Sequence, residues 1–223
     1  MTTIPFDMVG FDLDGTLLDT HQDLGAALNH ALAIAGRPLV PISEVSGLIG
    51  GGGRTMLRKA LERSGGILPD EEMAALYEHL IEYYAANIAN CTALFPGGEA
   101  MLDGLARRGV KVAVVTNKLE ALARKGFEAL GLTERFFTII GGDTLGPGRA
   151  KPKPDLIELM IERGGGGKAA FVGDTTYDIG AARAAGIPVV AVSFGFNDLP
   201  VDQLGADTII DHFEELIPAL AAL

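Results

Sequence analysis

Two aspartates, Asp12 and Asp14, are separated by one residue at the end of the first apolar run of the chain. Because alternate residues of a strand point to the same side, their carboxylates face one way while Leu13 turns toward the core. One carboxylate could attack phosphorus to form an acyl phosphate, and the other could protonate the leaving oxygen and later deprotonate water. The Asp14-Gly15 pair is also typical of solvated turns, so these residues alone leave both interpretations open.

Other polar residues come after later apolar runs. They are Thr116 with Asn117, Lys151 at the end of the loop after 136–140, and Asp174 with Asp178. Each has an ordinary explanation as a helix cap, a surface lysine or a solvated helix face, but together they favour one shared site. A hydroxyl, an amide and a lysine could hold phosphoryl oxygens, and clustered carboxylates repel one another unless a cation lies among them. Hard oxygen donors suit Mg²⁺, which would offset charge between a nucleophile and a phosphate.

Short apolar runs rich in Val, Ile and Phe alternate with helical patterns and must position these side chains. We expect buried strands over 6–13, 110–115, 136–140, 169–172 and 188–192, with a weaker one over 208–210. The intervening helices are expected over 98–108, 119–130, 154–163, 178–185 and 213–222. This alternation predicts an α/β fold with a Rossmann-like parallel sheet covered on both faces. In such sheets ligands bind at the carboxyl ends of the strands, where the polar residues would meet.

The stretch 20–93 breaks this alternation and contains no convincing strand. Its pattern predicts helices over 22–35, 42–49, 53–64 and 69–90. The chain returns to the sheet near Pro96-Gly97, a typical turn. We therefore predict a core domain from 1–19 and 94–223, with a helical cap domain inserted over 20–93. The glycine run 50–53 is either a structural turn or a helix break whose N–H groups approach an anion.

Composition excludes several classes of protein. The chain has 223 residues, of which 48% are hydrophobic, and a formal net charge of −11. This length supports a core without staples, and this hydrophobic share excludes wholesale disorder. The acidic balance, with 6% aromatic residues and no Trp, argues against a nucleic-acid partner. The single cysteine, Cys91, excludes a disulfide framework and is expected to be buried near the hinge between the domains, without a catalytic role.

No apolar run reaches the roughly 18 residues that a membrane-spanning helix needs. The first residues, 1–7, carry no basic region followed by an apolar stretch and are unlike a signal peptide. We therefore expect no membrane partner and a cytoplasmic protein.

The segments that carry the chemistry closely resemble the four motifs of the haloacid-dehalogenase superfamily of phosphatases. The segment 12–19 (DLDGTLLD) is similar to the first motif, Thr116-Asn117 to the second, Lys151 to the third and 173–178 (GDTTYD) to the fourth. Their order and spacing match along the whole chain, and the insert resembles the helical C1-type cap of one subfamily. Segments such as FPG at 95–97 are most similar to phosphoglycolate phosphatases.

The resemblance implies a role for each acidic residue of the site. Asp12 would be the nucleophile, and Asp14 would be the general acid and base. Mg²⁺ would be held by the carboxylates of Asp12 and Asp174 and by the backbone carbonyl of Asp14. Asp178 would lie just outside these ligands or contact the metal through water.

The same resemblance assigns the phosphoryl group to Thr116, Asn117 and Lys151. In the insert, Arg54 has two interpretations that the sequence leaves open. It is either an exposed arginine of a cap helix or the residue whose guanidinium binds a carboxylate of the substrate.

The implied function is that of a phosphatase acting on a small phosphorylated metabolite. The first expectation is 2-phosphoglycolate, and a sugar phosphate or pyrophosphate is the alternative. A receiver module that accepts a phosphoryl group belongs to another class, but it needs neither a leaving-group acid such as Asp14 nor a cap. A mutase or a non-catalytic scaffold fits less well, and monomer and homodimer both stay open.

Overall fold

A computed structural model describes residues 3–223, and within them six strands form one parallel sheet. The order across the sheet is β5-β4-β1-β6-β7-β8. The strands are β1 (Met8–Phe11), β4 (Lys111–Val115), β5 (Thr138–Ile140), β6 (Ala169–Gly173), β7 (Val189–Val192) and β8 (Thr208–Ile210). This confirms the predicted α/β fold. Residues 1–2 lie outside the described residues. They belong to the predicted core segment 1–19 and to the first residues, 1–7, that were expected to be unlike a signal peptide.

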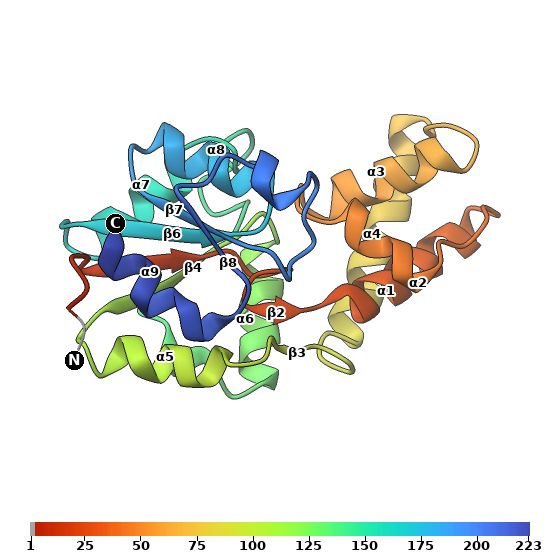
Figure 1. Ribbon diagram of the computed structural model, residues 1–223. Helices are drawn as coiled ribbons and strands as arrows, with labels where there is room; N and C mark the ends of the chain where they lie inside the picture. Colours follow the sequence, from red (N-terminus) through yellow and green to blue (C-terminus); the bar gives the residue numbers. More distant parts are fainter. Residues whose placement is uncertain (1–2) are drawn as a thin grey trace.

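The sheet is buried on both faces, as the near-continuous apolar strands predict. On one face Val9 and Phe11 pack in a core with α5 (Gly98–Ala106), α6 (Glu120–Ala129) and α9 (Leu216–Ala222). On the other face Met8 packs with α7 (Asp155–Arg163) and α8 (Thr176–Ala184). Figure 1 shows these two helical layers on either side of the strands. The central strand β1 is therefore held firmly, and the residues that follow it lie at the carboxyl ends of the strands.

The predicted insert is helical and lies to one side of the sheet (Figure 1). It consists of α1 (His21–Ile34), α2 (Ile42–Val45), a 3₁₀ turn (Ser46–Leu48), α3 (Gly53–Arg63) and α4 (Asp70–Ala86). Its apolar faces form a separate cluster, in which Leu28, Leu57 and Leu61 are fully buried. Leu122 and Phe196 from the sheet part join the edge of that cluster. The insert thus has its own core and also contacts the sheet part.

The segments that join the insert to the sheet differ from expectation. Leu18–Asp19 (β2) pairs with Ala93–Leu94 (β3) as a short antiparallel ribbon, although no strand was expected at 18–19 or 93–94. The ribbon is only two residues long on each side, too short for a period-two pattern to appear. It ties the outgoing and returning segments of the chain together.

Cys91 is exposed, so the prediction that it is buried is wrong. Its backbone N–H, rather than its side chain, makes the structural contact, because it donates to the Asp23 carboxylate at 3.0 Å. Thr92 donates to the same carboxylate from its N–H and its hydroxyl, at 2.9 and 2.7 Å. The segment therefore runs along the surface with its thiol outward. No helix among residues 3–223 is both long and apolar enough to cross a membrane.

Candidate active site

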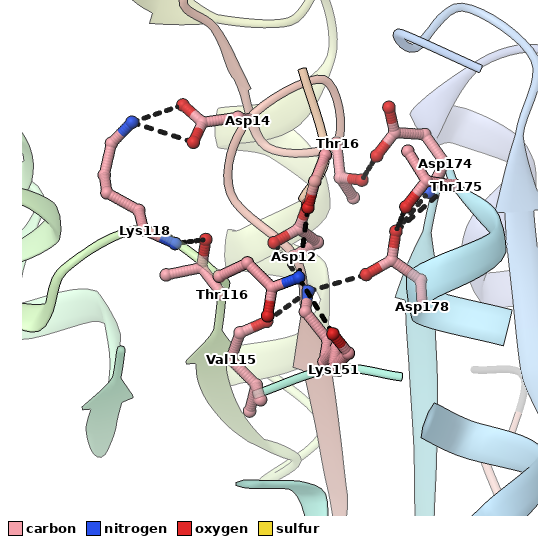
Figure 2. A network of polar contacts seen from close by, with 12 residues as sticks. Asp12, Asp14, Thr16, Val115, Thr116, Lys118, Lys151, Asp174, Thr175 and Asp178 are labelled. Carbon is pink, nitrogen blue, oxygen red and sulfur yellow. Dashed lines mark hydrogen bonds and ion pairs between the residues drawn. The ribbon is translucent and has the colours of Figure 1, made fainter. Parts of the chain in front are cut away.

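The polar residues predicted to share a site do meet at the carboxyl ends of the strands (Figure 2). Asp12 directly follows β1, Thr116 follows β4 and Asp174 follows β6. Lys151 arrives on the long loop after β5. All of these side chains are buried, with at most 4% of each residue exposed. Buried polar side chains need partners, so the contacts among them define the site.

Lys151 lies at the centre of the cluster. Its Nζ donates to Oδ1 of Asp12 at 2.8 Å, to Oδ1 of Asp178 at 2.6 Å and to the carbonyl oxygen of Val115 at 2.8 Å. Burial opposes its charge, but the attraction of the two carboxylates outweighs burial and raises the pKa of Lys151. The lysine is therefore held as an ammonium against Asp12, where it can offset the charge of a phosphoryl group.

The environment of Asp12 makes its charge costly. Burial raises the pKa of Asp12 from 3.8 to about 7; the nearby ammonium of Lys151 opposes this rise, and the carboxylate of Asp178 adds to it. A carboxylate in this position is short of cationic partners. A further cation beside Asp12 would hold it ionised and ready to act as a nucleophile.

Such a cation has a place to bind. Asp12, Asp174 and Asp178 each offer a carboxylate oxygen, and these oxygens all lie within 4.8 Å of one another. Burial raises the pKa of Asp174 well above its ordinary value, and the charges of Asp178 and Asp12 raise it further. Buried oxygen donors with excess negative charge fit a hard divalent cation such as Mg²⁺.

Asp174 and Asp178 are each oriented by other groups. Asp174 accepts hydrogen bonds from the hydroxyl of Thr16 at 2.8 Å and from the N–H of Phe196 at 2.7 Å. Asp178 caps the start of α8, where its Oδ2 accepts from the N–H and the hydroxyl of Thr175 at 3.0 and 2.6 Å. Its Oδ1 is bound to Lys151. Both carboxylates are therefore held in place beside Asp12.

Asp14 belongs to a second ion pair, which sequence reasoning missed. Nζ of Lys118 lies 2.7 and 2.8 Å from the two carboxylate oxygens of Asp14, and the hydroxyl of Thr20 donates to Oδ1 of Asp14 at 2.7 Å. The Lys118 side chain is only 7% exposed, and its Nζ lies 4.7 Å from the centre of the Tyr84 ring. Burial opposes the charge of Lys118, but Asp14 outweighs it and raises its pKa. Its place directly after Thr116-Asn117 was the available signal.

A pocket lies between this site and the helical insert. The sheet part contributes Asp12, Asp14, Thr116, Asn117 and Lys118. The insert side is mostly apolar and includes Leu24, Ile49, Met56, Leu80, Ile81 and Tyr84. The cavity is small, with a volume of about 40 Å³. It brings the apolar side chains of the insert together with Asp12, Asp14 and Lys118.

Two of the predicted substrate-binding residues have contacts that the sequence did not indicate. Arg54 is exposed and does not line the pocket; its guanidinium carbon lies 4.7 Å from the centre of the Tyr77 ring, which does. Asn117 donates from Nδ2 to the carbonyls of Gly50 and Lys151 at 3.1 and 3.2 Å. Its buried Oδ1 has no partner among the described residues. The phosphate-binding role of Asn117 and the carboxylate-binding role of Arg54 stay predictions.

Comparison with known proteins identifies the chain's relatives. The family model for haloacid dehalogenase-like hydrolases matches residues 9–192. The chain belongs to this family. It is 40% identical over 225 residues to a phosphoglycolate phosphatase of Agrobacterium fabrum, covering 99% of this chain and 95% of that protein. It is 39% identical over 217 residues to a phosphoglycolate phosphatase of Caulobacter vibrioides, covering 96% and 91%.

A solved structure gives the same result for this haloacid dehalogenase-like hydrolase. The crystal structure of a predicted phosphoglycolate phosphatase from Haemophilus somnus matches with a TM-score of 0.89 at 30% identity, covering 96% of this chain and 98% of that one. The resemblance drawn from the four motifs is thereby confirmed, and so is the prediction of a phosphatase. The names of its relatives are those of enzymes that act on a phosphorylated small molecule. These names disfavour the alternative of a receiver module.

The glycine run of the insert contacts the sheet part of this phosphatase directly. Gly52 precedes α3 with φ 84°, and a β-carbon there would lie 2.9 Å from the backbone oxygen of Asn117. The positive φ and the crowding of a β-carbon against Asn117 would both push the glycine run away from the sheet part. Gly52→Ala is therefore expected to lower kcat/KM about tenfold while the chain still folds. Steady-state kinetics together with thermal unfolding measures this.

Gly36→Ala is the matched control for that variant. Gly36 also has a positive φ, of 64°, but a β-carbon there would meet nothing within 4 Å. It introduces a β-carbon at a positive φ within the insert without touching the sheet part. Equal losses of activity in the two variants would show that backbone strain, rather than the contact with Asn117, is responsible.

Proposed function

We propose that this chain is a Mg²⁺-dependent phosphatase that hydrolyses 2-phosphoglycolate to glycolate and phosphate. The observation that carries the proposal is the buried contact of Asp12 with Lys151 beside Asp174, since Asp12 also lines a small pocket. The names of the relatives from Agrobacterium fabrum and Caulobacter vibrioides support the choice of substrate.

In the first half-reaction a carboxylate oxygen of Asp12 attacks phosphorus, and the bond between phosphorus and the ester oxygen breaks. Asp14 gives a proton to the departing oxygen, which leaves as the hydroxyl of glycolate. The ammonium of Lys151, 2.8 Å from Asp12, offsets charge on the phosphoryl group. Thr116, Asn117 and Lys151 would surround the phosphoryl oxygens. The product of this step is an aspartyl phosphate on Asp12.

In the second half-reaction water attacks the same phosphorus while Asp14 takes a proton from it. The bond between phosphorus and Asp12 then breaks, which frees phosphate and restores the carboxylate. The carboxylates of Asp12 and Asp174 and the backbone carbonyl of Asp14 would hold Mg²⁺, with Asp178 beside them. When bound, the metal neutralises charge between the nucleophile and the phosphoryl group.

Residues 20–93 would act as a cap domain of the C1 type over a core formed by 1–19 and 94–223. The separate apolar cluster of the insert and the pocket beneath it support this division. A cap that closes over the site would exclude water during the first half-reaction and select the leaving group. Opening and closing would take place at the β2–β3 ribbon. Nothing in this arrangement depends on whether the enzyme is a monomer or a homodimer.

Asp14→Asn is expected to lower kcat by about 10²- to 10⁴-fold, because the variant can neither protonate the leaving oxygen nor activate water. The loss in kcat/KM, which covers only the steps up to the aspartyl phosphate, should be smaller for p-nitrophenyl phosphate than for an alkyl phosphate, since nitrophenolate leaves readily without a proton. Steady-state kinetics on both substrates measures this. An equal loss in kcat/KM on both substrates would contradict leaving-group protonation by Asp14.

The substrate is tested by the kcat/KM for phosphate release with Mg²⁺. A value of about 10⁴ M⁻¹s⁻¹ or more for 2-phosphoglycolate, in the normal range for an enzyme and its substrate, is the expected result. A panel of sugar phosphates and pyrophosphate covers the alternative substrates. If one of these is turned over far faster than 2-phosphoglycolate, the phosphatase chemistry stands but the proposed substrate does not.

A further inference from the structure

Lys118 has a feature that the hydrolysis mechanism above does not use. It is the only cationic side chain among the described residues that line the pocket. It lies on the side of the pocket that holds Asp14, the group proposed to protonate the leaving oxygen, rather than beside Lys151. The leaving-group part of a substrate bound in the pocket would therefore lie beside Lys118.

The other lysine of the site is not available for this task. Nζ of Lys151 already contacts Asp12, Asp178 and the carbonyl of Val115, which accounts for the three N–H donors of an ammonium. Lys118 makes two contacts with the carboxylate of Asp14 and a side-chain hydrogen bond with Tyr84, which lines the same pocket. A carboxylate bound in the pocket would take the place of the Tyr84 hydroxyl on Lys118.

The rest of the pocket wall, within the described residues, offers a charged leaving group no other cationic side chain. The insert side is mostly apolar, and the rings of Tyr77 and Tyr84 complete it. A carboxylate buried against such a wall loses its water and needs a charged partner within the site. The pocket thus suits a leaving group with one negative charge.

We propose that Lys118 is the specificity-determining residue of this site, and that its ammonium binds the carboxylate of a short hydroxy-acid leaving group while it remains paired with Asp14. The inference rests on the proposed function and replaces Arg54 by Lys118 as the partner of the substrate carboxylate. Arg54 is exposed, lies over the Tyr77 ring and does not line the pocket.

The experiment compares two substrates that differ only in the group that Lys118 would bind. One is 2-phosphoglycolate, and the other is 2-hydroxyethyl phosphate, in which an uncharged hydroxymethyl group replaces the carboxylate. The readout is the ratio of the two kcat/KM values. Loss of the contact between Lys118 and Asp14 would slow both substrates and cancel in the ratio, so the ratio isolates recognition of the leaving group.

The wild-type ratio is expected to favour 2-phosphoglycolate strongly. Lys118→Met should lower that ratio about 10- to 100-fold, the effect of losing one charged hydrogen bond. Lys118→Arg keeps the charge and should retain part of the preference. Arg58→Met is the control for removal of a positive charge, because Arg58 is exposed and pairs with Glu62 on the same helix, away from the pocket; its ratio should equal that of the wild type.

Several results would overturn the inference. A high wild-type ratio that is unchanged in Lys118→Met would mean that Lys118 serves only to hold Asp14, while the proposed function stands. A ratio that collapses in Arg54→Met instead would assign the carboxylate to the insert. A wild-type ratio near one, with active hydrolysis of both esters, would remove the proposed substrate together with the inference.

A second measurement covers the case in which Lys118→Met does not fold. Glycolate should compete with 2-phosphoglycolate in the wild type far better than ethylene glycol does. Its inhibition constant should rise in Lys118→Arg, because the longer guanidinium shifts the charge. Equal, weak inhibition by glycolate and ethylene glycol would show that no group in the pocket binds the carboxylate.

Discussion

Asp12→Asn is expected to abolish phosphatase turnover, with a loss of more than about 10³-fold, while the chain remains folded. The amide is a poor nucleophile toward phosphorus, and no other group on β1 can replace it. The side chain keeps its size, so the packing of the buried cluster around Lys151 changes little. Phosphate release from 2-phosphoglycolate and from p-nitrophenyl phosphate, with thermal unfolding of the same preparation, measures both parts of this expectation.

Asp202→Asn is the matched control, because it makes the same chemical change at an exposed position of a 3₁₀ turn, Val201–Gln203. It should have wild-type activity. Mass spectrometry adds a direct readout, because wild-type protein quenched during turnover should carry a phosphoryl group at Asp12 and the variant should not. Substantial activity of Asp12→Asn in a preparation free of host phosphatases would rule out Asp12 as the nucleophile.

Removal of divalent metal with EDTA is expected to lower activity by at least about 10²- to 10³-fold, since a bound cation contributes several kcal/mol to charge stabilisation. Added Mg²⁺ should restore it. Without metal, the excess charge falls on Asp12 and Asp174, and burial is the main reason that the pKa of each is raised. Activity that persists in EDTA after extensive dialysis would contradict the proposed metal dependence.

The raised pKa of Asp12 predicts how the stability of the metal-free protein depends on pH. An acid whose pKa is higher in the folded chain binds its proton more tightly when folded, so its contribution to stability is present at low pH. For Asp12 this contribution is lost as the pH rises from about 3.8 through about 7. Mg²⁺ binds the ionised carboxylates, so the difference in Tm between Mg²⁺ and EDTA should widen over this interval.

Thermal unfolding of the wild type and of Asp12→Asn, each in EDTA and in Mg²⁺ between pH 5 and 8, tests that dependence. The variant cannot ionise at position 12, so its Tm in EDTA should fall less steeply with pH than that of the wild type. Parallel curves for the two proteins would show that Asp12 does not carry the effect.

The sequence alone determined the strands, most helices and the shared location of the catalytic motifs. Periodicity is a local property, so a run such as Val112–Val115 within β4 can be identified as a buried strand without knowledge of its neighbours. Asp12, Thr116 and Asp174 each directly follow such a strand. In a parallel sheet that position is sufficient to bring them to one edge.

Only the tertiary structure decided the contacts between side chains or backbone groups that lie far apart in the sequence. Lys118 pairs with Asp14 across 104 residues of sequence. Its place after a threonine and an asparagine does not by itself identify Asp14 as its partner. The guanidinium of Arg54 lies over the Tyr77 ring rather than in the pocket. Cys91 is exposed, and its backbone N–H donates to Asp23. Such contacts are set by long-range packing of side chains, for which local periodicity carries no information.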